Sequence, residues 1–293
     1  MKPRFSVIMP LYNKAPYVRK ALESVCAQTY TDWECIVIDD GSTDGSATIC
    51  EEFIHSLTPS LAPSFHIIHQ PNAGVAAARN RGVAASQGEY VCFLDADDWW
   101  QPEFLEEIDR LIAAYPDAGI YATNYVYFKP GKTHIALHEP DGLMNYPKAY
   151  LTNGSMPVTS ITACMPRKVF DAMGGFPERI VLGEDFLLWA KTALHHPIAY
   201  SSKPLAIYNN AVPPSQRATC NLYTPEKHML FHLDEIEQLA ASSPQAEEWK
   251  ALLDKLKEGR KQFNQPMWWR RFKQIYMRLG SLCKQVILQI GKS

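Results

Sequence analysis

The stretch "SVIMPLYNKAPYVRKALESVCAQTYTDWECIVIDDGSTDGS", residues 6–46, decides the fold class. The apolar run over residues 5–9 stops at Pro10 and predicts a short buried strand. Apolar residues then recur at helical spacing over residues 18–26, after Pro16, which suits the first turn of a helix. The run "ECIVIDD" predicts a second strand, and the Gly, Ser and Asp residues that follow predict a turn. A strand, a helix and a second strand are the repeating unit of a parallel sheet.

The same alternation continues along the first hundred residues. The segments "FHIIHQ" and "YVCFLD" predict strands, and "ATICEEFIHSL" and "AGVAAARNRGVAAS" predict helices. Four such cycles indicate an α/β fold with a mostly parallel sheet, right-handed crossovers and helices on both faces. After Trp100 the sequence predicts an amphipathic helix, "PEFLEEIDRLIAAY", a strand-rich "AGIYATNYVYF", an irregular segment over residues 129–158 and a helix, "GEDFLLWAKTALHH".

The domain organisation predicted from these patterns is one catalytic domain with an extension. Residues 1–222 form the domain, with a nucleotide-binding half over about 1–100 and an acceptor half over about 101–222. Residues 223–293 form a helical, basic C-terminal extension, since no strand pattern follows Thr224.

Charge is distributed unevenly along the 293 residues, although the formal net charge is only −2. From Lys250 to the end, eleven Lys and Arg stand against two acidic residues, whereas the earlier part has 18 basic and 29 acidic residues. Seven scattered cysteines form no CxxC pair, and the apolar run before Pro10 is too short for a signal peptide. We therefore expect a cytoplasmic protein with no nucleic-acid partner.

Polar residues follow each predicted strand. The first strand leads into Pro10-Leu11-Tyr12-Asn13, the second ends in Asp39-Asp40, the third is followed by Asn72, and the fourth by Asp95-Ala96-Asp97-Asp98. Ligands of parallel sheets bind at the carboxyl ends of the strands, so a ligand is expected where these side chains gather. Three neighbouring carboxylates repel one another, and either water in an ordinary acidic turn or a bound cation must compensate. Phosphate-binding GxGxxG and GxxxxGK[ST] motifs are absent from the sequence.

Three motifs in this order resemble those of the family 2 glycosyltransferases, which have the GT-A fold. They are the stretch at residues 6–46, "NAGVAAARNRGVAASQGEYVCFLDADD" and "GGFPERIVLGEDFLLW", and the resemblance covers about residues 4–210. It implies transfer of a sugar from a nucleotide diphosphate donor, usually with inversion and with Mn²⁺ or Mg²⁺ as cofactor. A QxxRW motif typical of processive members is absent from the sequence, so a single transfer per encounter is expected.

The resemblance also implies roles at the donor side. Asp98, with Asp97, is expected to bind the metal, since Mg²⁺ and Mn²⁺ prefer carboxylate and phosphate oxygens. Asp95 or Asp97 is expected to hold the ribose or orient the site. The remaining residues implied to contact the nucleotide are Pro10, Tyr12, Asn13, Asp40, Asn72 and Arg79. Asp40 is expected to accept the imino N–H of a pyrimidine, which favours a UDP-sugar. The alternatives are that Asp40 only begins a turn with Gly41 and that Arg79 is a surface residue.

The family's "ED" pair corresponds to Glu184-Asp185. Asp185 is expected to be the base that deprotonates the acceptor hydroxyl, and Glu184 to position the acceptor or the loop. The alternative is that both acids complement the dipole of the helix that they begin. The family often has Arg or His after the tyrosine that follows this helix, but here Tyr208 is followed by Asn209-Asn210.

Residues 249–290 alternate basic residues with Trp and aliphatic residues at helical spacing. Such a helix can lie on an anionic membrane, which would hold the enzyme at the inner leaflet near a lipid-linked acceptor. Packing against the acidic catalytic domain and formation of homo-oligomers are the alternatives. The glycan or lipid-linked acceptor belongs, by family expectation, to bacterial polysaccharide, lipopolysaccharide or capsule synthesis. Rival functions are a nucleotidyltransferase and a non-catalytic nucleotide- or sugar-binding module of the same fold.

Overall fold

The computed structural model describes residues 2–59, 61, 64–216 and 224–260. The strands, in chain order, are β1 (Phe5–Leu11), β2 (Trp33–Asp39), β3 (Phe65–His69), β4 (Tyr90–Phe93), β5 (Trp99–Trp100), β6 (Ile120–Lys129), β7 (Lys132–Ile135), β8 (Gly142–Leu143), β9 (Ala163–Pro166) and β10 (Ile198–Asn209). The α-helices are α1 (Val18–Cys26), α2 (Ser46–Ser56), α3 (Val75–Ala85), α4 (Phe104–Ala114), α5 (Tyr146–Asn153), α6 (Arg167–Met173), α7 (Glu184–His195), α8 (Asp234–Ala240) and α9 (Ala246–Glu258).

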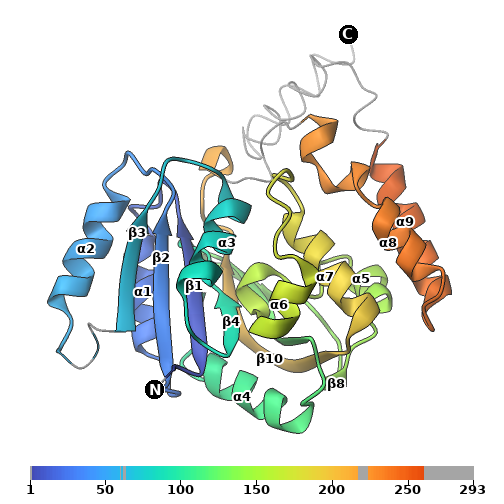
Figure 1. Ribbon diagram of the computed structural model, residues 1–293, viewed down its shortest axis with the longest axis horizontal. Helices are drawn as coiled ribbons and strands as arrows, with labels where there is room; N and C mark the ends of the chain where they lie inside the picture. The colour runs from blue at the N-terminus through green and yellow to red at the C-terminus, as the bar shows by residue number, and fades with distance from the viewer. Residues whose placement is uncertain (1, 60, 62–63, 217–223, 261–293) are drawn as a thin grey trace.

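One mixed sheet in the order β3-β2-β1-β4-β9-β6-β10-β5 runs through the molecule (Figure 1). Its first four strands are parallel, and so are β6 and β10, whereas β9 runs antiparallel to both of its neighbours. The expected α/β class is confirmed, and the parallel part is the half that carries the predicted nucleotide motifs. β3 and β4 lie on opposite sides of β1, so right-handed crossovers place α1 and α3 on opposite faces (Figure 1).

The strands form because their side chains are almost all apolar. Every residue of β1 and β2 is buried, as expected for parallel strands covered on both faces. Helix α3 packs on β1 so closely that a Cβ at Gly82 would lie 2.4 Å from Cγ2 of Ile8. The small residues of this helix therefore set its distance from the sheet.

Two sequence expectations about local structure are wrong. β1 does not stop at Pro10 but continues to Leu11. Ile8 accepts from Leu94 N on the β4 side, so by alternation the missing N–H of Pro10 faces the side where β4 has already ended. The segment 129–158 is not irregular throughout, because β7, β8 and α5 lie in it. Asn145 caps α5 by accepting from Lys148 N, and Pro147 lies in the first turn.

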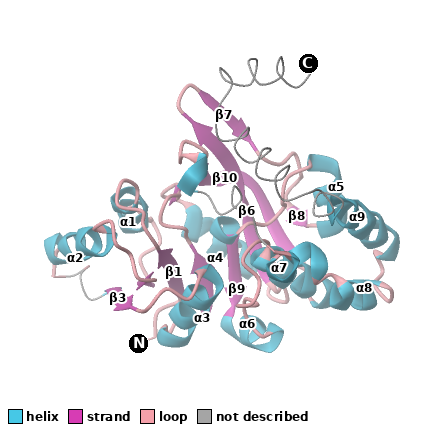
Figure 2. Cartoon of the chain, turned by 90° about the horizontal axis from the view of Figure 1, so that it is seen from above, coloured by secondary structure: helices cyan, strands magenta, loops and turns pink. Residues whose placement is uncertain are grey.

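The C-terminal extension packs on the acceptor half over residues 224–260. α8 contacts α7, and α9 contacts α5, as both views show (Figures 1 and 2). Trp249 of α9 is fully buried, and its ring lies 5.8 Å from that of Tyr146. The predicted boundary after residue 222 falls among residues 217–223, and residues 261–293 of the predicted tail also lie outside the described residues. Among the described residues, the helices are all too short or too polar to traverse a bilayer.

Candidate functional site

The loops after β1, β2 and β3 are tied together at the carboxyl edge of the sheet. Asn13, which has a left-handed φ of 52°, accepts from Thr43 N at 2.8 Å through its side chain. Asn72 donates through Nδ2 to the main-chain oxygen of Asp40 at 3.1 Å. The side chain of Tyr12 is 48% exposed at this edge, whereas Pro10 is buried inside β1. The predicted nucleotide residues therefore do gather, with one exposed aromatic ring among them.

Asp40 is buried and organises the loop that precedes α3. Its Oδ1 accepts from Gln70 Nε2 at 2.7 Å and from Ala73 N at 2.8 Å, and its Oδ2 accepts from Gly74 N at 2.9 Å. These three donors fix the orientation of the Asp40 carboxyl group. The predicted contact from Asp40 to a pyrimidine stays a prediction, since these three groups are its partners here.

Arg79 is buried and bridges the two acidic motifs. Its Nη2 donates to Asp95 Oδ1 at 2.7 Å and to Ser160 Oγ at 3.0 Å, and its Nη1 donates to Glu184 Oε1 at 2.8 Å. Burial alone would lower the pKa of Arg79, but the charges of Asp95, Glu184 and Asp185 raise it. The alternative of a surface arginine is therefore wrong. Its guanidinium group therefore links a carboxylate of α7, Glu184, to a carboxylate of the loop after β4, Asp95.

Asp97 and Asp98 point to different partners. Lys14 donates through Nζ to Asp97 Oδ2 at 2.5 Å and to the main-chain oxygen of Gln216 at 3.2 Å. Asp98 is 4% exposed, and its Oδ1 accepts from Asn209 N at 2.7 Å. Burial raises the pKa of both carboxyls, Lys14 opposes the rise at Asp97, and at Asp98 the neighbouring aspartates add to it.

The described part of the chain contains no group of three or more His, Cys, Asp or Glu side chains placed to hold a metal ion. The donor set of Asp97 and Asp98 nevertheless fits a hard divalent cation that completes its shell with phosphate oxygens and water. After burial, the charge of Asp97 is the next cause of the raised pKa of Asp98, which shows that the two carboxylates repel each other. A cation bound between them would reduce this repulsion.

Asp185 lies in the first turn of α7, partly buried, and its Oδ1 accepts from Phe186 N at 2.8 Å. Burial and then the charge of Glu184 raise the pKa of Asp185 to about 7, while Arg79 opposes the rise. Burial raises the pKa of Tyr146 and Tyr150 of α5, and the nearby charge of Asp185 adds to the rise. A carboxylate with a pKa near neutrality is suited to accept a proton.

Three residues that complete this network were not predicted as site residues. Lys14 pairs with Asp97, Ser160 donates to Asp95 Oδ2 at 3.2 Å, and Asn209 donates through its backbone to Asp98. Lys14 directly follows Tyr12-Asn13, so its place in the loop was available as a signal. Ser160 and Asn209 come from distant segments that only the tertiary structure brings here.

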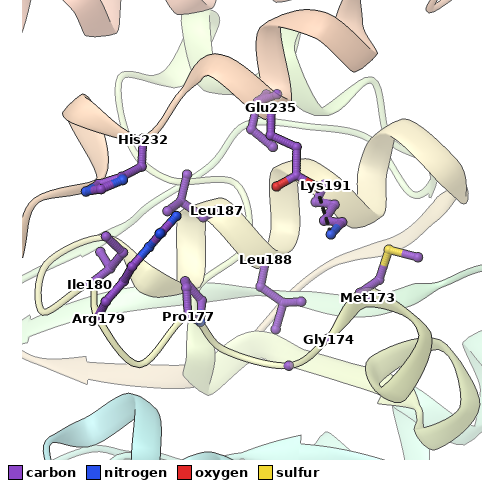
Figure 3. A pocket seen from close by; sticks show the side chains of 12 residues that line it. Met173, Gly174, Pro177, Arg179, Ile180, Leu187, Leu188, Lys191, His232 and Glu235 are labelled. Atoms are coloured by element: carbon purple, nitrogen blue, oxygen red, sulfur yellow. Dashed lines mark ion pairs between the residues drawn. The ribbon is translucent and has the colours of Figure 1, made fainter.

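A cavity of about 280 Å³ lies away from this site, along α7 (Figure 3). It lies between the loop at residues 174–180, the α7 side chains Leu187, Leu188 and Lys191, and His232 with Glu235 of the extension. None of the predicted site residues lines it.

Comparisons with known proteins identify glycosyltransferases as relatives. The chain is 38% identical over 135 residues to glycosyltransferase GlyA of Streptococcus pneumoniae, which is 46% of this chain and 18% of that protein. It is 36% identical over 133 residues to the putative glycosyltransferase EpsH of Bacillus subtilis, which is 45% of this chain and 37% of that protein. The match thus spans well under two thirds of the length of these relatives.

Two solved structures share the fold. TarS residues 1–349 from S. aureus, in complex with UDP-GlcNAc, align over 90% of this chain and 73% of that chain, with a TM-score of 0.72 and 20% identity. The mannosyltransferase PcManGT from Pyrobaculum calidifontis, in complex with GDP-Man and Mn²⁺, aligns over 100% and 80%, with a TM-score of 0.55 and 19% identity. They confirm the expected GT-A fold.

The family model for glycosyl transferase family 2 matches residues 6–174, more than half of the chain. By that match, this chain belongs to glycosyl transferase family 2.

Proposed function

We propose that this protein transfers a sugar from a nucleotide diphosphate sugar to a hydroxyl of a glycan or lipid-linked acceptor, with inversion at the anomeric carbon. The observation that carries the proposal is the position of Arg79. Its guanidinium joins Asp95, beside the predicted diphosphate carboxylates, to Glu184, beside the predicted base. In this proposal the donor end and the acceptor end of the transfer reaction meet at this side chain.

In the proposed reaction Asp185 takes the proton of the acceptor hydroxyl. The hydroxyl oxygen forms a bond to the anomeric carbon from one side while the bond to the diphosphate oxygen breaks on the other, and the bonding electrons leave with the nucleotide diphosphate. Because the pKa of Asp185 is about 7, its carboxyl group is substantially ionised at neutral pH and is basic enough to accept the proton.

The nucleotide half supplies the donor site in this proposal. The exposed ring of Tyr12 stacks on the base, and Asp40 with Asn72 lines the side where the base's polar edge lies. A carboxylate favours a base that offers an N–H, so we favour UDP-sugars. TarS and PcManGT were solved with UDP-GlcNAc and GDP-Man, respectively, which supports a nucleotide-sugar donor without choosing between the two bases.

Mn²⁺ or Mg²⁺ is the proposed cofactor, held by Asp98 and Asp97. When bound there, the ion would neutralise charge on the departing diphosphate. Lys14 is paired with Asp97 in the structure and provides a second positive charge on the same side. The charge of a bound divalent ion would offset the charges of Asp97 and Asp98, so that these carboxylates would not repel the phosphates of the donor.

Release of free nucleotide from a panel of nucleotide sugars, with and without saccharide acceptors, tests the proposal. Wild-type protein should release UDP from at least one UDP-sugar, and Asp185→Asn and Asp98→Asn should each reduce the rate by about two orders of magnitude or more. Glu23→Gln on the exposed side of α1 is the matched charge control. Donor binding without turnover by wild-type protein would favour the rival binding module. A nucleotidyltransferase is disfavoured because "PLYNKAPY", at the end of β1 and in the loop that follows, offers no Gly-rich phosphate loop.

Membrane attachment through the tail remains a proposal for the basic residues after Arg260, and so does the inner-leaflet location. Trp249 is removed from that surface because it is buried against α5. Flotation with vesicles of anionic and of neutral lipid, for the full chain and for a chain ending at residue 260, tests it. Equal flotation of both proteins would contradict the idea, and a concentration-dependent mass would favour oligomers.

A further inference from the structure

The C-terminal extension reaches the loop that immediately precedes the proposed base. Val181 N and Leu182 N both donate to the main-chain oxygen of Lys227, at 2.9 and 3.2 Å, and Met229 N donates to Leu182 O at 3.0 Å. The pairing forms an isolated parallel bridge between Leu182 and His228. Residues more than forty positions apart in sequence thus share a short ladder, two to three residues before Glu184 and Asp185.

Met229 lies directly on Gly183, the N-cap residue of α7. A Cβ added at Gly183 would lie 2.3 Å from Cγ of Met229, so no larger residue fits. Gly183 also has a left-handed φ of +84° and provides no side-chain cap for the helix. The position at which α7 begins is therefore held by the backbone pairing and by the Met229 side chain.

A cavity and an ion pair follow this pairing along α7. The cavity of about 280 Å³ separates Ile180 and Leu187 from His232 (Figure 3). Across it, Lys191 and Glu235 form an ion pair at 2.9 Å, about two turns further along the helix. The pairing at residues 227–229 is therefore the contact of the extension next to the first turn of α7, a turn that Arg79 also holds through Glu184.

The segment that supports α7 is itself held by Arg260, two residues beyond the end of α9. Arg260 Nε donates to the main-chain oxygen of Leu230 at 2.6 Å, and its guanidinium lies 5.5 Å from the ring centre of Phe231. These two residues belong to η6 (Met229–Phe231), which follows η5 (Pro225–Lys227). Because α9 is anchored to α5 through buried Trp249, a continuous set of contacts runs from the core to Met229.

We propose that residues 227–230, held by Arg260, are a positioning element for Asp185, and that the extension is thereby part of the catalytic machinery. Met229 and the backbone of Lys227 fix where α7 begins and so fix where the Asp185 carboxylate lies. This inference rests on the proposed function. It predicts that a change in the extension alters the chemical step and leaves donor binding, which depends on β1–β4, unchanged.

The first test compares Met229→Ala with the conservative Met229→Leu. Displacing a base by about 1 Å costs roughly 10- to 100-fold in rate, so Met229→Ala should lower kcat by that factor with the donor KM within about twofold. Met229→Leu should recover most of the rate. Met144→Ala is the matched control, since Met144 is also partly buried but lies between β8 and α5. Arg260→Gln should also lower kcat, because it removes the hydrogen bond that holds Leu230, the residue next to Met229.

A second readout is the pH dependence. Asp185 is faced by Glu184 on its own helix, by Arg79 of α3, by Asp95 after β4, and by Tyr146 and Tyr150 of α5. Since burial is the largest cause of its raised pKa, a displaced Asp185 should ionise at lower pH. The acid limb of the kcat profile should therefore move below that of wild type in Met229→Ala. A purely structural role for Met229 would leave it in place.

Hydrogen exchange separates this inference from the proposed function. Amides of residues 181–188 should exchange faster in Met229→Ala than in wild type or Met144→Ala, whether or not a donor is known. Exchange equal to that of the control, or rates and pH profiles that match the control, would overturn the inference. Failure of wild-type protein to turn over any nucleotide sugar would instead count against the proposed function. If Met229→Ala does not fold, Arg260→Gln and Met229→Leu decide by the same measurements.

Discussion

Arg79 Nη1 donates to Glu184 Oε1 at 2.8 Å, an ion pair that joins α3 to the first turn of α7. Both side chains are buried, and the other amino group of Arg79 holds Asp95. Two motifs that lie about ninety residues apart in the sequence are therefore parts of one electrostatic network. One Arg against Asp95 and Glu184 gives it a negative formal charge, which agrees with the divalent cation proposed above.

Replacing Arg79 by Met should inactivate and destabilise the protein. Glu184 would be left buried without its cation, and losing one partner of a buried pair costs about 3–5 kcal/mol. Thermal unfolding and donor turnover measure the two effects. Arg81→Gln on the exposed side of the same helix is the control and should change neither. A fully stable Arg79→Met protein would show that the ion pair contributes little.

Turnover should fall as pH drops through about 7, because Asp185 becomes protonated there and can no longer accept a proton. Since the charge of Glu184 helps to raise that pKa, Glu184→Gln should move the midpoint to lower pH. The measurement is kcat against pH under saturating donor and acceptor. A midpoint that stays in place in Glu184→Gln would remove Asp185 as the titrating group.

Asp185→Asn should stabilise the protein at high pH. The folded pKa of Asp185 is raised above its unfolded value, so the native state binds more protons and stability falls as pH rises between the two values. At pH 5 Asp185 is mostly protonated in the native state, so the neutral Asn side chain resembles it in charge and size. At pH 8 the variant should be more stable than wild type by on the order of 1–3 kcal/mol. Denaturant unfolding of both proteins at pH 5 and pH 8 measures the difference in the free energy of unfolding. A stability gain of Asp185→Asn that is the same at pH 5 as at pH 8 would contradict the linkage.

Lys14→Gln should tighten binding of Mn²⁺ to the protein without donor. The Lys14 ammonium neutralises Asp97 in the structure, so it competes with a cation for that carboxylate. Calorimetric titration with Mn²⁺ should show a severalfold gain, whereas Lys132→Gln on exposed β7 should match wild type. Weaker Mn²⁺ binding in Lys14→Gln would mean that Lys14 orders the carboxylates rather than competing at them.

The sequence predicted the parts of the fold in which local pattern and tertiary environment agree. β1, β2 and β4 follow their apolar runs closely because they are buried, and α1, α2 and α4 follow apolar periodicity because each has one buried face. Helix α5 was missed although its Asn145 cap and Pro147 are local signals, because the apolar contact that stabilises it, Tyr146 on Trp249, involves a residue a hundred positions away. The gathering of the site residues at one sheet edge was predictable from topology.

Partners within the site were less accessible to prediction. Nothing local to Arg79 distinguishes an exposed arginine from one buried between two carboxylates, and the alternative of a surface position was wrong. Trp249 fits an amphipathic membrane pattern equally well by spacing, yet its neighbours in space bury it. Periodicity tells which face of a helix is apolar and leaves open what covers that face.

The burial of Trp249 also governs how shortened forms of this protein would behave. A polypeptide ending at residue 222 would lack α8 and α9. The surfaces of Tyr146 and α7 that these two helices cover would then be open to water, and so would the part of the core that Leu233 and Leu252 help to fill. Such a product should aggregate during purification, and its inactivity would say nothing about the basic tail. Termination after Arg260 keeps that hydrophobic contact intact and is the informative place to cut.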